Sequence, residues 1–144
     1  MRLPLIFFSL LALIFSVASQ AAAAAPDWVL VDENQDSAFF YDRNGTTPAR
    51  DGMIQVRTRV VYTDQGKKEA LKVLHGLPES SRLYESRYMY RIDCVEKQGR
   101  LVGVTHFDKN GIILRSSDLG ETAALEYLYP GSRMAVVADD NCSP

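Results

Sequence analysis

The sequence predicts an α+β domain: a predominantly antiparallel sheet of about five to seven strands, a helix in the middle of the chain and a short C-terminal helix. Several segments alternate polar and apolar residues with a period of two, the pattern of strands with one buried face. Turn-forming Asn-Gly and Asp-Gly pairs lie between these segments. Only two stretches show a helical pattern preceded by a capping residue.

Residues 1–23 are predicted to be a secretory signal peptide and not part of the fold. Arg2 precedes an apolar run over residues 3–18, and small residues follow that resemble a cleavage site. Cleavage after Ala21 or Ala23 fits this pattern. The run is shorter than the ~20 apolar residues of a comfortable membrane span. We therefore expect residues 24–144 to form one exported domain, in the periplasm or at the cell surface, that is not an integral membrane protein.

Composition excludes several classes of protein. The chain has 144 residues, of which 24% are charged, and its net charge is −2. Such a balance argues against a nucleic-acid-binding protein, which usually carries a strong basic excess. Ordinary charge content with 47% hydrophobic residues argues against disorder. Two cysteines are too few for a four-cysteine zinc site.

The first strands are predicted over residues 27–31 and 38–42, which are rich in aromatic and branched apolar side chains. Turns follow at Asn44-Gly45 and Asp51-Gly52. A longer strand is predicted over residues 53–62, where two faces alternate. The apolar face carries Ile54, Val56, Thr58, Val60 and Tyr62, and the polar face carries Gln55, Arg57 and Arg59.

The middle helix is predicted over residues 66–76. Thr63 or Asp64 provides its N-cap, and Gly76 and Pro78 end it. Its apolar stripe consists of Ala70, Leu71, Val73, Leu74 and Leu77. Lys68, Lys72 and His75 form the opposite, solvated face.

The second half of the chain is predicted to form an antiparallel meander. The strand over residues 82–95 points Tyr84, Ser86, Tyr88, Tyr90, Ile92 and Cys94 inward, and Glu85, Arg87, Met89, Arg91 and Asp93 outward. Strands over residues 101–107 and 112–117 flank a tight turn at Asn110-Gly111. Residues 119–129 allow either a helical turn or a strand. Ser132 is expected to cap a final helix from Arg133 to about Asp139.

Cys94 and Cys142 are predicted to form a disulfide. Export places them in an oxidising compartment, where an even number of cysteines usually pairs. Neither a CxxC spacing nor an adjacent histidine indicates a redox or metal pair. In the chain-entropy model a closed loop of about 50 residues contributes roughly 4 kcal/mol of stability.

Motifs of known catalytic chemistry are absent from the sequence, so we predict a non-enzymatic protein without metal or cofactor. His106, beside Phe107 and Asp108, is the candidate acid–base group of the alternative, a minor periplasmic enzyme. A second alternative is a small-ligand carrier whose pocket lies between the sheet and the helix and is lined by Tyr84, Tyr88 and Phe107. The run Asp139-Asp140-Asn141 lacks the glycine and distant glutamate of a calcium loop.

The candidate binding surface is the polar side of the two long strands, which carries Arg57, Arg59, Arg87 and Arg91. If the strands are neighbours, these side chains form a patch that can bind an acidic glycan or an acidic segment of a partner protein. The alternative is a solvated face with cross-strand ion pairs to Glu85 and Asp93, each contributing only ~0.2–1 kcal/mol.

Several landmarks together resemble a known family. They are a strand led by Trp28, a strand ending in Phe40-Tyr41-Asp42, a strand with Val56 and Tyr62, a long strand with Cys94, the run Tyr129-Pro130-Gly131-Ser132, and a short helix ending in Cys142. Over residues 24–144 the chain is similar to the surface-adhesin protein E-like family of bacterial exported domains. The resemblance implies an antiparallel sheet supported by helices, a disulfide, and an adhesin-like role in contacting a macromolecule. It implies no catalytic residues.

Overall fold

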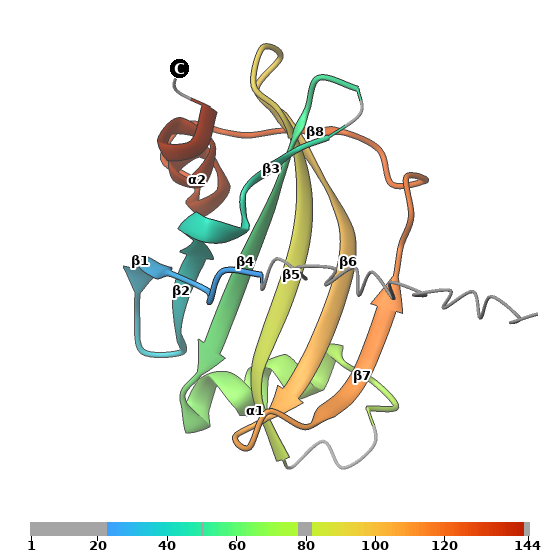
Figure 1. Cartoon of the computed structure of the whole chain (residues 1–144). Coiled ribbons are helices and arrows are strands. Elements are labelled where there is room, and N and C mark those ends of the chain that lie inside the picture. The colour runs from blue at the N-terminus through green and yellow to red at the C-terminus, as the bar shows by residue number, and fades with distance from the viewer. Residues whose placement is uncertain (1–22, 50, 78–81, 143–144) are drawn as a thin grey trace, which may run out of the picture.

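The computed structural model describes residues 23–49, 51–77 and 82–142, so the predicted signal peptide and Pro78 lie outside the described residues. One eight-stranded antiparallel sheet dominates the fold, with the main order β1-β2-β4-β5-β6-β7 (Figure 1). These strands are β1 (Trp28–Glu33), β2 (Ser37–Asp42), β4 (Ile54–Tyr62), β5 (Leu83–Asp93), β6 (Gln98–Asp108) and β7 (Ile113–Asp118). The short β3 (Thr47–Pro48) pairs with β4, and β8 (Glu126–Tyr127) pairs with β6.

The remaining elements are a 3-10 turn, η1 (Arg43–Gly45), and the helices α1 (Asp64–Val73) and α2 (Arg133–Cys142). The predicted α+β class is therefore confirmed, with β3 and β8 as two-residue additions to the expected strands. The ambiguous stretch over residues 119–129 forms a loop and β8, without a helix. No helix among the described residues is both long and apolar enough to cross a membrane.

Helix α2 covers one face of the sheet and forms the core with it. Val56, Ile92 and Val137 are fully buried there, and they pack with Phe39, Tyr41 and Ala138. Burying a side chain of this kind contributes ~1.5–3 kcal/mol. The predicted disulfide is confirmed: Cys94, just after β5, is bonded to Cys142 at the end of α2, with Cα atoms 5.5 Å apart. The cross-link therefore holds α2 against the sheet.

Helix α1 lies on the same side of the sheet as α2, at the opposite end (Figure 1). Its predicted cap is confirmed, because Thr63 Oγ1 accepts a hydrogen bond from Gly66 N at 3.1 Å. A Cβ on Gly66 would lie 1.8 Å from the Asp36 carbonyl oxygen, so only glycine permits this approach. The predicted apolar stripe is wrong at Val73, which is 78% exposed. The helix ends at Val73, and the chain beyond it turns to bury Leu77 instead.

The expected inward face of β5 is wrong at Tyr84. The pairing of β5 with β6 shifts register between Leu83 and Glu85, which interrupts the alternation. Leu83 is buried as a result, and Tyr84 is 44% exposed. From Ser86 to Ile92 the predicted alternation holds. The residues expected to point inward, Ser86, Tyr88, Tyr90 and Ile92, face the helix-covered side together with their partners on β4.

Candidate functional site

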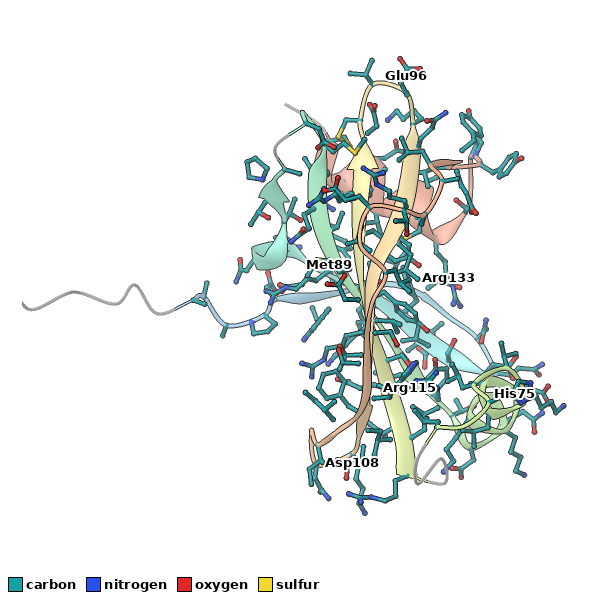
Figure 2. The ribbon with its side chains drawn as sticks, turned by 90° about the vertical axis from the view of Figure 1, so that its right-hand side faces the viewer. His75, Met89, Glu96, Asp108, Arg115 and Arg133 are labelled. Carbon is teal, nitrogen blue, oxygen red and sulfur yellow. A yellow bond between two sulfur atoms is a disulfide. The ribbon has the colours of Figure 1, made fainter. Side chains whose placement is uncertain are left out.

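The face of the sheet opposite α2 gathers arginines from three adjacent strands. Since β4 and β5 are neighbours, the four predicted arginines lie together, and Arg100 of β6 joins them. We call this surface the arginine face; its members are Arg57, Arg59, Arg87, Arg91 and Arg100. Figure 2 shows the sheet nearly edge-on, with both helices on one side and the N-terminal segment on the other, which is the side of the arginine face.

Arg59 and Arg87 are direct cross-strand partners, and Glu85 lies between their guanidinium groups. The shortest Arg87–Glu85 distance is 2.6 Å and the Arg59–Glu85 distance is 3.7 Å. The Glu85 side chain is only 7% exposed. Two cations directly opposite each other repel, so this buried carboxylate makes the juxtaposition tolerable. We call this pair of opposed arginines, together with Glu85, the Glu85 pair.

Aromatic rings extend the Glu85 pair into a column that the sequence did not reveal. The Arg59 guanidinium lies 4.6 Å from the centroids of both Trp28 and Phe40. The Arg87 guanidinium lies 4.3 Å from the Phe107 ring and 5.9 Å from the Trp28 ring. Each such contact contributes ~0.5–1 kcal/mol at a partly exposed site. The column fastens β1, through Trp28, to the centre of the arginine face.

Arg57 is held by a different buried carboxylate. Its Nη2 donates to Asp42 Oδ2 at 2.5 Å, and the Asp42 side chain is fully buried. Asp42 Oδ1 also accepts hydrogen bonds from the backbone N–H groups of Asp27 (2.9 Å) and Asn44 (3.1 Å). Asp42 therefore ties together the N-terminal segment, η1 and the arginine face. In the sequence, Asp42 stands out only as the end of the Phe40-Tyr41-Asp42 run that contributes to the family resemblance.

Arg91 and Arg100 form the second directly opposed pair of arginines. Arg91 Nη1 donates to Glu121 Oε1, and Arg100 Nη1 donates to the Glu121 carbonyl oxygen at 3.0 Å. Asp51 lies 3.7 Å from Arg100. Glu121 belongs to the loop between β7 and β8, and its side chain is 61% exposed. We call the opposed arginines Arg91 and Arg100, together with Glu121, the Glu121 pair.

A cavity of about 630 Å³ opens on the arginine face between the segment around Pro26 and the loop over residues 118–121. Strands β4 to β7 form its floor. Its charged lining consists of Arg57, Arg87, Arg91, Asp118 and Glu121, and its apolar lining includes Trp28, Met89 and Phe107. At Gly103 a Cβ would come no closer than 3.6 Å to the Ser117 carbonyl oxygen, so the missing side chain leaves open floor.

His106 does not belong to this cavity, because it lies on the other face and is 1% exposed. Its Nδ1 is 2.7 Å from Ser86 Oγ, which also accepts from the Tyr62 hydroxyl at 3.0 Å. Burial, reinforced by the nearby Arg115 guanidinium, lowers the pKa of His106. Burial likewise raises the pKa of Tyr88, whose hydroxyl is 3.3 Å from that of Tyr62. This network is enclosed beneath the surface.

The other candidate residues are dispersed. The expected carrier pocket between sheet and helix does not coincide with this cavity, which lies on the face opposite the helices. Its lining includes Phe107 and Tyr88, although the Tyr88 hydroxyl belongs to the network on the other face, and it does not include Tyr84. His75 is exposed beyond the end of α1. Asp93 accepts hydrogen bonds from the backbone of the β5–β6 turn, and among the described residues it forms no ion pair with the four arginines, unlike in the solvated-face alternative. No group of three His, Cys, Asp or Glu residues within the described ranges is placed to hold a metal ion.

No protein-family model, no curated protein and no solved structure matches this chain. The resemblance to the surface-adhesin protein E-like family therefore stays a prediction.

Proposed function

We propose that this chain is an exported, non-enzymatic binding domain that contacts an acidic segment of a partner protein through its arginine face. The observation that carries the proposal is the cavity of about 630 Å³ into which three guanidinium groups project from neighbouring strands. Ligand sites commonly have volumes of ~300–1,000 Å³, so the cavity is large enough for several side chains of a bound segment.

Guanidinium groups suit this task because their planar, rigid donors match the geometry of a carboxylate. In the cavity they surround a floor that includes Met89, Gly103 and Phe107. Such a surface offers charge recognition at its rim and apolar contact at its centre. The combination fits a glutamate-rich peptide, whose carboxylates can meet the guanidinium groups while the methylene groups of its side chains pack on the apolar floor.

Export and the adhesin-like role belong to the same proposal. The predicted signal peptide and the Cys94–Cys142 disulfide support location in an oxidising compartment, the periplasm or the cell surface. The strand led by Trp28 and the helix ending in Cys142 support membership of the surface-adhesin protein E-like family. Absence of enzymatic activity is supported by the burial of His106 away from the cavity.

The test is binding of a blocked hexaglutamate peptide to the exported, oxidised chain, measured by isothermal titration against a hexaglutamine peptide. We expect hexaglutamate to bind more tightly, with an affinity that falls as salt is added. Arg91→Gln should lower the affinity for hexaglutamate about fivefold or more, since the substitution removes a charged donor from the cavity. Lys68→Gln removes the same charge from the exposed face of α1 and is the matched control. It should change the affinity for hexaglutamate less than about twofold.

Equal binding of the two peptides would contradict the proposal. Equal effects of the two substitutions would place the peptide contact away from Arg91. Binding of a sulfated glycan in the absence of peptide binding would assign the face to acidic glycans instead.

A second candidate, a small-ligand carrier, is supported by the apolar residues Trp28, Met89 and Phe107 in the lining of the same cavity. Native mass spectrometry of the exported protein tests it. A co-purified molecule of defined mass that hexaglutamate displaces would favour the carrier over the peptide-binding domain.

A further inference from the structure

We infer that Arg91 and Arg100 form a carboxylate-binding subsite, and that Glu121 occupies it in the free protein as an internal stand-in for an acidic side chain of the partner. The inference rests on the proposed function and specifies where the partner's carboxylate binds. It also assigns Glu121 a role as a competitor of the ligand.

The subsite requires a carboxylate for electrostatic reasons. Arg91 and Arg100 are direct partners across β5 and β6, where two like charges destabilise the pairing. The Nε atoms of both arginines are buried and have no hydrogen-bond partner among the described residues. In the free protein the anion is supplied by the Glu121 side chain, through Arg91 Nη1.

Glu121 is placed so that it can be exchanged. Its side chain is largely exposed and comes from a loop, and the loop is braced by short-range contacts, such as Asp118 Oδ1 accepting from Gly120 N at 2.9 Å. The second anion near the subsite, Asp51, is 3.7 Å from Arg100 and also exposed. Exposed ion pairs contribute little to stability, so an incoming carboxylate replaces Glu121 at small cost.

The position of the subsite indicates the chemistry of the ligand. Arg91 also lines the cavity, next to the Met89 side chain and the open floor at Gly103. A carboxylate bound by Arg91 and Arg100 would thus direct the neighbouring residue of the same peptide over an apolar floor. The ligand expected is an extended acidic peptide in which the residue next to the bound carboxylate offers apolar groups, such as the methylene groups of a glutamate, to the floor.

A distinctive consequence is that removing Glu121 strengthens binding. Glu121→Gln takes away the competing carboxylate, and the expected gain is about threefold to fivefold in affinity, the equivalent of one exposed ion pair. Asp118→Asn removes the same charge from the same cavity lining. Asp118 forms no ion pair with an arginine within the described ranges, so its expected gain is clearly smaller.

The experiment is a titration of blocked hexaglutamate into the nitrogen-15-labelled exported chain, as wild type, Glu121→Gln and Asp118→Asn. The salt concentration is about 0.15 M, so that long-range charge effects are screened. The resonances of the arginine Nε–H groups report which guanidinium groups the peptide contacts. Thermal unfolding of each variant verifies that the fold is retained.

The inference is supported if the peptide shifts the Arg91 and Arg100 resonances and Glu121→Gln binds at least about threefold more tightly than Asp118→Asn. It is overturned if the two variants bind equally, or if the peptide shifts only Arg57 and Arg87; the proposed function survives either result. Absence of binding by all three proteins overturns both the inference and the proposed function.

Discussion

The Glu85 pair and the Glu121 pair are built from the same parts and differ in how the carboxylate is held. In each, two arginines face each other directly across neighbouring strands. The Glu85 carboxylate forms ion pairs with both of its arginines, whereas the Glu121 carboxylate pairs with Arg91 and the Glu121 carbonyl oxygen accepts from Arg100. Glu85 comes from the strand itself and is buried, and aromatic rings cover its arginines. Glu121 comes from a loop and is exposed.

This difference separates a structural role from the proposed binding role, although the side chains are of the same kinds. Removing a buried carboxylate such as Glu85 leaves two opposed arginines without the anion that lies within the sheet between them, which is costly. An exposed carboxylate exchanges its partner for water or for a ligand at little cost. The arginine face thus contains one half that fastens β1 and β2 to the sheet and another half that can accept an anion.

The largest expected effect comes from neutralising the two glutamates in turn. Glu85→Gln should lower the free energy of unfolding by about 3 kcal/mol, because it leaves Arg59 and Arg87 opposed without a carboxylate. Glu121→Gln should change it by less than about 0.5 kcal/mol. Urea unfolding of both variants measures the contrast. Equal losses would remove the distinction between the two pairs.

The next effect tests whether the aromatic column belongs to the structural half. Trp28→Leu keeps apolar bulk and removes two cation–π contacts, so we expect a loss of about 1–2 kcal/mol in unfolding free energy. Tyr127→Leu, which replaces an exposed ring of β8 that faces no arginine of the column, is the matched control. Comparable losses in the two variants would argue against a specific role of the column.

A third change fills the cavity beside the Glu121 pair and leaves the Glu85 pair untouched. Gly103→Val adds a side chain whose Cβ would lie 3.6 Å and 3.9 Å from its nearest atoms, which is ordinary van der Waals contact. The affinity for hexaglutamate should fall about tenfold, or ~1.4 kcal/mol, because the valine side chain occupies part of the cavity. Unchanged affinity would place the binding site outside the cavity, and circular dichroism verifies the fold.

The smallest expected effect concerns pH and separates the arginine face from the helix-covered face. The pKa of His106 is lowered by burial, so the unfolded chain takes up a proton at a higher pH than the folded one. Stability is therefore fully present above the ordinary histidine pKa and declines as pH falls towards the folded value. Arginine remains charged throughout.

The measurement is the free energy of unfolding between about pH 7 and about pH 5, for the wild type and for His106→Asn. A flatter profile for the variant is the expected result. His75→Asn serves as the control, because His75 is exposed. Identical profiles for wild type and His106→Asn would show that another group causes the decline.

Sequence patterns predicted much of the fold because they are local. Alternation along residues 53–62 and 82–95 placed Arg57, Arg59, Arg87 and Arg91 on the polar side of two strands, and a single hairpin turn made neighbours of β5 and β6. The patterns failed where local order is interrupted: a register shift turned Tyr84 outward, and the end of α1 left Val73 exposed.

The α+β class, the disulfide and the placement of the predicted arginines on one side of their strands follow from the sequence alone, since a period of two and a pair of cysteines are properties of short segments or of composition. Which arginines oppose each other, and which carboxylates pair with them, follows from the tertiary structure. Trp28, Glu85 and Glu121 reach the same surface from β1, β5 and a loop. Their contacts depend on strand order and register, which bring together residues far apart in the chain, and no local pattern encodes that proximity.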